Sequence, residues 1–250
     1  MTLGLMQPYF FPYLGYFDLI SRCDQWIVFD TAQYIRRGWV NRNRILHPTF
    51  SWQYITVPVN KHNRETPINE METNAYDEWA SRILGQLQHY RKKAPGYAST
   101  VRLVEECLSS RETNLARLNV LTLRKTCETL GISFQGQVLS EMDLKLGPVA
   151  GPSDWALRIS ETLKIDEYIN PPGGLELYDP QAFAASGIKL TIQKPFQFGY
   201  ECPGYKFEPG LSVIDALMWN SPETIWEHFK SLKSQNTTEE VNSHLSGIRL

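Results

Sequence analysis

The residues best equipped for chemistry lie near the N-terminus, and many of them are basic. Between Thr31 and Arg64 the chain has no acidic residue, but it has one lysine and five arginines. The whole chain, in contrast, has a formal net charge of −2. Guanidinium groups bind phosphate or carboxylate oxygens in pairs, so this segment predicts an anionic ligand. We expect four arginines to bind it: Arg36, Arg37, Arg42 and Arg44. A solvated hairpin face is the alternative.

A short extended segment in this region alternates basic and amide side chains. If Val40–Leu46 is a strand, Arg42 and Arg44 share one face, because side chains alternate with a period of two. Asn41 and Asn43 then share the other face. Their amides both donate and accept hydrogen bonds, so we expect them to read hydroxyl and amide groups of a ligand.

Tryptophans accompany the basic residues. Trp39 follows Gly38, and Trp52 lies beyond the predicted strand. Basic residues interleaved with aromatic ones are typical of single-stranded nucleic-acid binding. The same combination can also hold a nucleotide or a sugar diphosphate, and either tryptophan can instead belong to the core. We include Trp39 among the candidate ligand-binding residues.

The segment Gln7–Phe17 combines aromatic residues with two prolines and a glycine. Proline fixes φ and lacks a backbone donor, so regular structure stops here. The resulting rigid aromatic wall, which includes Tyr9 and Tyr13, can stack on a base or a sugar ring. Gln7 adds an amide donor and acceptor. A packed loop under a sheet is the competing interpretation.

Asp30 ends the apolar run Trp26–Phe29, which reads as a strand. A carboxylate at such a position is costly unless it is paired or lies in a cleft. We therefore predict that Asp30 holds an amine and accepts its proton, although a turn aspartate would look the same. Gln33 follows and is a further candidate for reading polar groups. We find no motif for a metal, a P-loop or a nucleophile elbow, and expect no metal and no tightly bound cofactor.

These residues must be positioned by an α/β fold. Strands are predicted at Thr2–Gln7, Trp26–Phe29, Val40–Leu46, Trp52–Val59, Ile68–Thr73 and Ser133–Leu139, and strands then alternate with helices. This pattern predicts a mainly parallel or mixed sheet with flanking helices. Apolar residues at helical spacing predict a central helical segment at about 75–131. We expect a single domain over 1–233 and a polar tail over 234–250. Ligands of such sheets bind at the carboxyl ends of strands, where Asp30 and the loop Asn170–Gly174 follow predicted strands.

The composition fits a cytoplasmic protein. The four cysteines form no Cys-x-x-Cys pair, which argues against a zinc site or a disulfide framework. No run of about 18 apolar residues is present, and we expect neither a signal peptide nor a membrane partner.

Several motifs, taken in order, resemble the WbqC-like family of bacterial proteins. The chain carries Gln-Pro-Tyr-Phe-Phe-Pro-x-x-Gly-Tyr-Phe, Asp-x-x-Gln, Trp-x-Asn-Arg-Asn, Thr-x-Pro-Val and Pro-x-Leu-Ser-Val-Ile-Asp, at 7–17, 30–33, 39–43, 56–59 and 209–215. The sequence departs from many relatives at two histidines, since Met6 precedes Gln7 and Lys194 precedes Pro195. Chemistry that depends on those histidines is absent here or is done differently.

The resemblance implies a role in surface-polysaccharide or O-antigen biosynthesis. Our leading hypothesis is an acyl- or aminoacyltransferase, possibly a glycyltransferase, acting on a nucleotide-linked amino sugar. Its co-substrate would be an activated acyl or aminoacyl donor, as a thioester, an adenylate or a tRNA ester. Two alternatives remain: a protein that binds RNA or tRNA through segment 34–64, and a non-catalytic subunit of a glycan-biosynthesis complex.

Overall fold

The computed structural model describes the backbone of residues 1–246 and the side chains of residues 1–174 and 176–234. At its centre is a five-stranded sheet in which every pairing is parallel, in the order β5-β2-β1-β6-β7. The strands are β1 (Thr2–Met6), β2 (Gln25–Val28), β5 (Gly136–Val138), β6 (Glu167–Asn170) and β7 (Lys189–Ile192). The predicted α/β class with a mainly parallel sheet is therefore confirmed.

Helices cover both faces of this sheet, and the strand residues alternate between them. Trp26 and Val28 of β2 belong to the larger core cluster, whereas Ile27 between them belongs to a second cluster. The second cluster is built with α5 (Asp154–Thr162) and α6 (Pro180–Ala185). The larger cluster includes α1 (Leu14–Ser21). Parallel strands that are apolar on both faces are typical of such covered sheets.

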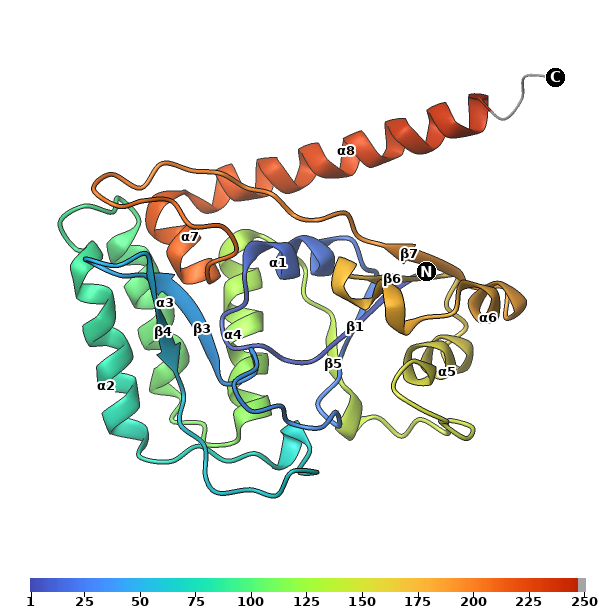
Figure 1. Ribbon diagram of the computed structural model, residues 1–250, viewed down its shortest axis with the longest axis horizontal. Helices are drawn as coiled ribbons and strands as arrows, with labels where there is room; N and C mark the ends of the chain where they lie inside the picture. The colour runs from blue at the N-terminus through green and yellow to red at the C-terminus, as the bar shows by residue number, and fades with distance from the viewer. Residues whose placement is uncertain (247–250) are drawn as a thin grey trace.

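The predicted central helical segment consists of three helices. They are α2 (Tyr76–Leu87), α3 (Tyr97–Ser109) and α4 (Leu115–Leu130), with a 3₁₀ turn, η2 (Gln88–Tyr90), after the first. Asn114 caps α4 by accepting a hydrogen bond from the backbone N–H of Arg117, and Gly131 ends the helix with φ 70°. Both ends follow the expected capping chemistry. Figure 1 shows these helices beside the hairpin of β3 (Arg42–Leu46) and β4 (Trp52–Thr56).

The remaining elements complete the body. Short 3₁₀ turns are η1 (Ile68–Glu70), η3 (Leu139–Glu141) and η4 (Pro172–Leu177), and the last helices are α7 (Val213–Trp219) and α8 (Pro222–Ser246). The predicted strand at Ile68–Thr73 is wrong. Its apolar residues Ile68 and Met71 are three apart, and both are buried in the turn of η1 and the residue after it. Helix α8 also extends into the expected tail, of which 247–250 lie outside the described residues.

The order of the strands creates a switch point in the centre of the sheet. From β1 the chain adds β2 and β5 on one side, and it later adds β6 and β7 on the other side. The connections that leave the carboxyl ends of β1 and β6 therefore diverge, and a crevice opens between them. Ligands of open parallel sheets bind in such crevices.

Candidate functional site

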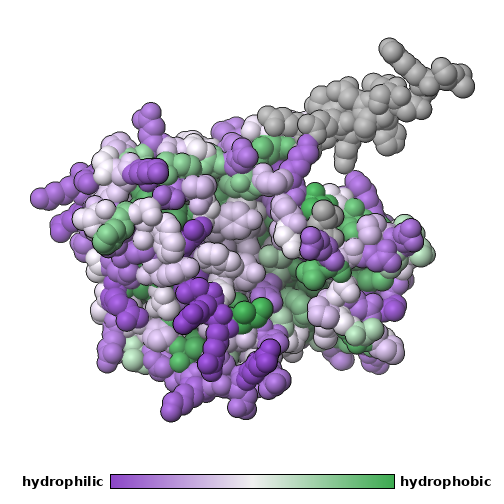
Figure 2. All heavy atoms as spheres, in the orientation of Figure 1, coloured by the Kyte–Doolittle hydropathy of each residue, from purple (hydrophilic) through white to green (hydrophobic). Residues whose placement is uncertain are grey.

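A cleft with a volume of about 720 Å³ lies at this switch point. Its walls come from both diverging connections, with Gln7, Tyr9 and Tyr13 after β1 and the loop Asn170–Gly174 after β6. Figure 2 shows apolar surface in a hollow between the part that carries α5 and α6 and the rest of the molecule. The volume falls within the usual range for small-molecule and cofactor sites. The expected place at the carboxyl ends of strands is where the cleft is found.

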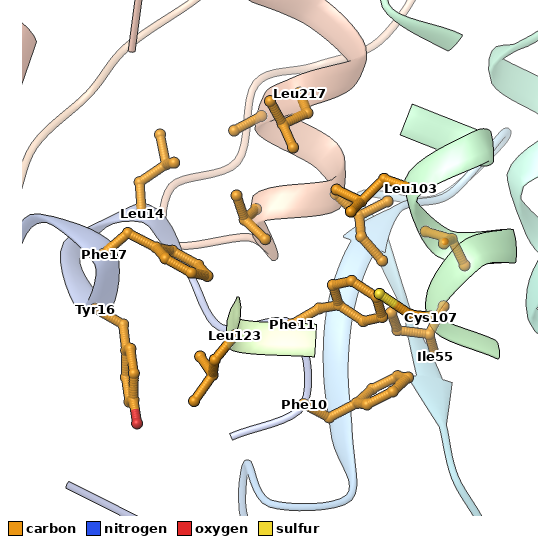
Figure 3. Packing of buried hydrophobic residues seen from close by; sticks show 14 of the residues in the cluster. Phe10, Phe11, Leu14, Tyr16, Phe17, Ile55, Leu103, Cys107, Leu123 and Leu217 are labelled. Atoms are coloured by element: carbon orange, nitrogen blue, oxygen red, sulfur yellow. The ribbon is translucent and has the colours of Figure 1, made fainter. Parts of the chain in front are cut away.

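The aromatic segment after β1 divides its side chains between the cleft and the core. Tyr9 and Tyr13 are partly buried and line the cleft, whereas Phe10 and Phe11 are completely buried. Figure 3 shows the two phenylalanines among core residues such as Ile55. The wall predicted from the composition is thus made by the tyrosines, and the phenylalanines anchor it.

Side-chain donors fix the backbone of this segment. The Asn43 amide donates to the carbonyl oxygens of Phe10 and Phe11, at 3.1 and 2.9 Å. The Asn119 amide donates to the carbonyl of Pro8 at 2.8 Å, and the Ser212 hydroxyl to that of Phe11 at 2.7 Å. Phe11 has a φ of 41°, a left-handed conformation that is costly for a bulky side chain. The surrounding hydrogen bonds hold this strained residue, so the tyrosines on either side of it are held in place.

The polar groups on this wall are available to a ligand. Within the described part of the chain, the side chains of Gln7, Tyr9 and Tyr13 make no hydrogen bond to the protein. Burial, with a smaller contribution from Tyr13, raises the pKa of Tyr9. Burial, with a smaller contribution from Asp18, likewise raises the pKa of Tyr13. Both phenols therefore stay protonated at neutral pH and can donate hydrogen bonds to a carbonyl or phosphate oxygen.

The alternation predicted for the following strand is observed. Asn41 and Asn43 are buried, whereas Arg42 and Arg44 are partly exposed on the opposite face of β3. Asn41 donates to the backbone of Val57 at 2.8 Å and does not line the cleft. Asn43 lines the cleft while holding the aromatic segment. The two amides thus have structural hydrogen bonds, and only one of them reaches the ligand space.

Arg44 lies beside the cleft and is held by aromatic rings. Its guanidinium carbon is 5.5 Å from the ring centre of Trp39 and 5.2 Å from that of Trp52. One guanidinium nitrogen donates to the carbonyl oxygen of Gly210 at 3.3 Å, and Trp39 and Gly210 both line the cleft. Its Nε is buried without a hydrogen-bond partner among the described residues. The other guanidinium nitrogens are the ones that can reach a ligand, because Nε is covered by the protein.

The contacts of Arg42 are with residues that do not line the cleft. Its guanidinium stacks 4.0 Å from the ring centre of Tyr54, and it donates to the carbonyl oxygen of Arg37. Neither Arg42 nor Arg44 has a carboxylate partner within salt-bridge distance among the side chains that are described. The positive charge of β3 is therefore not neutralised within that part of the protein.

The other predicted basic residues lie on two exposed loops. Arg36 Nε donates to His62 Nε2 at 3.3 Å, and the Gln33 amide donates to the carbonyl of Arg64 at 2.6 Å. These contacts join the loop of Arg36 and Arg37 to the loop of His62 and Arg64. None of them lines the cleft, so the structure divides the predicted basic site into an outer pair of loops and the cleft-side Arg44.

Asp30 is also outside the cleft. It follows β2, but its side chain is only 1% exposed. The carboxylate accepts a hydrogen bond from the backbone N–H of Ser140 at 3.0 Å and another from the Ser140 hydroxyl. This contact ties the end of β2 to η3. The surroundings of Asp30 therefore favour a positioning role over contact with a substrate.

Several residues that shape the site are not among those predicted from the sequence. Phe29, Tyr178, Phe196 and Gly210 line the cleft. Phe196 and Gly210 belong to a segment without regular periodicity. Only the motif that begins at Pro209 distinguishes this segment in the sequence. No group of three or more His, Cys, Asp or Glu side chains that could hold a metal occurs among the residues described. Burial raises the pKa of the Cys23 thiol to about 12, which leaves it protonated.

Comparison with known proteins identifies the class of this chain. The family model of the WbqC-like protein family matches residues 7–227, and the chain belongs to that family. The match covers every residue that lines the cleft except Leu5 and Met6.

A particular relative is a protein of Mycobacterium tuberculosis (strain ATCC 25618 / H37Rv) described as "Uncharacterized protein Rv1507c". It is 29% identical over 231 residues, which cover 86% of this chain and 92% of the relative. No solved structure matches this chain. No helix in the described part of the chain is long and apolar enough to cross a membrane.

Proposed function

We propose that this protein is an acyl- or aminoacyltransferase that acts on a nucleotide-linked amino sugar in polysaccharide biosynthesis. The observation that carries the proposal is the combination of a large cleft at the switch point with unpartnered donors on its wall and Arg44 beside it. The WbqC-like family is linked to polysaccharide biosynthesis in general, which supplies the substrate class.

The size and polarity of the cleft fit such a substrate. A nucleotide-linked sugar has flat, polar and anionic parts, and the cleft offers an aromatic wall, amides and a guanidinium. In the proposal, Arg44 binds a diphosphate oxygen, and Tyr9 or Trp39 stacks on the base or the sugar. Gln7 and Asn43 face the hydroxyl and amide groups of the substrate, and the Gln7 amide is free to donate and accept hydrogen bonds.

The reaction would form an amide bond. The neutral amine nitrogen attacks the acyl carbonyl carbon, the bond from that carbon to the leaving group breaks, and the departing group takes up the proton that the nitrogen loses. Negative charge develops on the carbonyl oxygen during the attack. Protonated phenols at Tyr9 and Tyr13 and the Gln7 amide would stabilise that charge, as fixed donors do in other acyl transfers. Asp30 is proposed as a positioning residue, because its carboxylate accepts a hydrogen bond from Ser140 and so ties the end of β2 to η3.

A transfer assay tests the proposal. Purified protein is incubated with nucleotide-linked amino sugars and with acyl thioesters, acyl adenylates or aminoacyl-tRNA, and amide products are detected by mass spectrometry. We expect product with at least one donor, and a loss of roughly 10- to 100-fold in rate for Tyr13→Phe combined with Gln7→Ala. Arg91→Ala is the matched control, since Arg91 is exposed and outside the cleft. Undiminished turnover in the double variant would contradict the assigned roles.

RNA binding is the second candidate, and the paired outer loops favour it. Arg36, Arg37, Lys61 and Arg64 are all exposed there, and Figure 2 shows hydrophilic side chains over the lower edge of the molecule. Binding of bulk tRNA that weakens steeply with salt and is lost in an Arg36→Ala, Arg37→Ala double variant would support it. In that case the tRNA would be either the ligand or the carrier of the acyl donor. A non-catalytic subunit would instead be recognised by a stable co-purifying partner on the exposed Ile35 and Phe50.

A further inference from the structure

A second pocket, with a volume of about 510 Å³, opens beside the cleft. Its walls come mainly from the segment 196–211, which runs from β7 across the molecule to α7 (Figure 1). The pocket and the cleft share Tyr13, Phe196 and Gly210. The two spaces therefore adjoin at these residues.

Aromatic rings form a corner in the side pocket. The rings of Tyr200 and Phe207 are 5.0 Å apart and meet at 85°, and Phe198 lies 5.7 Å from Tyr200. The Tyr200 hydroxyl donates to the buried Asp215 carboxylate at 2.7 Å, which fixes the ring. The faces of aromatic rings attract alkylammonium groups, because each face carries partial negative charge.

The side pocket also contains a carboxylate. Glu208 lines it and is partly buried, and it has no hydrogen bond or ion pair within the described part of the chain. The Arg44 guanidinium donates to the carbonyl of Gly210, a residue that lines both the cleft and the side pocket. Lys206 is exposed and does not line the pocket. The side pocket therefore offers a carboxylate that is not paired within that part of the chain, together with aromatic rings.

We infer that the side pocket binds an alkylammonium group, held between the faces of Phe198, Tyr200 and Phe207 and the carboxylate of Glu208. A hard metal cation fits poorly, because it takes six or more oxygen ligands and the pocket offers one carboxylate. Gly210 then lies between two binding regions of opposite charge preference. On the side of the cleft Arg44 would bind an anionic group, and on the side of the pocket Glu208 would bind a cationic group.

This inference assigns one part of the proposed substrate to the side pocket, and the identity of that substrate rests on the proposed function. A nucleotide-linked amino sugar has an anionic diphosphate and an amine, which match the two sides. The amine of the acceptor would enter the side pocket as the ammonium ion and pass one proton to the Glu208 carboxylate before its nitrogen attacks the acyl donor. Glu208 thus takes the place that the sequence analysis gave to Asp30.

Calorimetric titration with choline tests the pocket itself. Its uncharged isostere, 3,3-dimethyl-1-butanol, has the same shape and is the reference. We expect choline to bind at least about fivefold more tightly than the isostere, and Glu208→Gln and Phe207→Leu each to remove most of that preference. Glu201→Gln is the matched control, because Glu201 is exposed on the same segment and lines neither pocket. Equal affinity for the two probes, or equal effects of Glu208→Gln and Glu201→Gln, would overturn the inference.

A second titration separates the pocket from the proposed function. UDP-glucosamine should bind more tightly than UDP-glucose, and Glu208→Gln should reduce the first affinity to the level of the second. If both UDP-sugars fail to bind while choline binds through Glu208, the proposed substrate is wrong and the pocket stands. If both bind equally well, the assignment of the acceptor amine to the pocket is wrong.

Discussion

Individual residues show how one short sequence can serve both the core and the site. In Tyr9–Tyr13, neighbouring aromatic side chains lie in different places. Phe10 and Phe11 pack in the core, and the tyrosines face the cleft. The composition predicted an aromatic wall, but the left-handed turn at Phe11 that sorts these side chains has no sequence signal. In β3, by contrast, strand periodicity alone was enough to separate Arg42 and Arg44 from the asparagines.

Asp30 shows that the position of a single residue can be predicted from the sequence while its partner cannot. Its position after a strand was predicted, and strand ends are where functional carboxylates are found. Its partner Ser140 is 110 residues away, however, and no local pattern predicts that contact. Glu208 was not predicted as a site residue, because no pattern near it in the sequence indicates a pocket.

His89 gives the protein a pH dependence of stability. Burial, the largest cause, lowers the pKa of His89 from 6.5 to about 4. Between those values the unfolded state binds more protons than the folded state, so the free energy of unfolding falls as the pH falls from about 6.5 to about 4. Because His89 is partly exposed, we expect a contribution of about 1–2 kcal/mol.

Urea unfolding at about pH 7.5 and about pH 4.5 measures this contribution. The difference between the two free energies should shrink by that amount in His89→Gln. An unchanged difference in His89→Gln would show that His89 titrates normally in the folded protein.

At the scale of elements, the sheet and the three central helices were predictable, because they depend on local periodicity and caps. The side of the cleft formed by η4 was predictable only in part, from the proline and glycine residues that follow β6. The segment 196–211 was not predictable, since it is fixed by distant contacts. One of these is the hydrogen bond from the Arg44 guanidinium to the Gly210 carbonyl, between residues 166 positions apart.

The contact between β6 and η4 leads to a test of the cleft wall. A Cβ atom on Gly174 would lie 1.8 Å from Nδ2 of Asn170, whereas a Cβ on Gly173 would meet nothing within 4 Å. Asn170 is buried and accepts a hydrogen bond from the Tyr168 hydroxyl, so it cannot easily move away. We expect Gly174→Ala to destabilise the protein by about 1–3 kcal/mol and to weaken ligand binding.

Gly173→Ala is the matched control, because both glycines line the cleft in adjacent positions. Its unfolding free energy and ligand affinity should stay close to those of the wild type. Equal behaviour of the two variants in chemical unfolding would mean that η4 does not pack on Asn170 as described.

For the whole molecule, the arrangement of charge is more informative than its sum. The net charge of −2 hides a basic segment that the fold divides between two exposed loops and the side of the cleft. The sequence predicted that an anion would be bound near these arginines, and it did not distinguish those that reach the cleft. That distinction required the hairpin to be placed against Gly210, a contact between residues 166 positions apart.

The central claim is that the cleft binds a nucleotide-linked sugar with the help of Arg44. The most direct measurement is calorimetric titration of UDP-glucosamine into the wild type, Arg44→Met and the outer-loop variant Arg37→Met. A charged hydrogen bond contributes about 1.5–3 kcal/mol, so Arg44→Met should bind roughly 10- to 100-fold more weakly, and Arg37→Met like the wild type. Equal affinity of all three proteins, or loss of binding in Arg37→Met alone, would place the ligand outside the cleft and contradict the account.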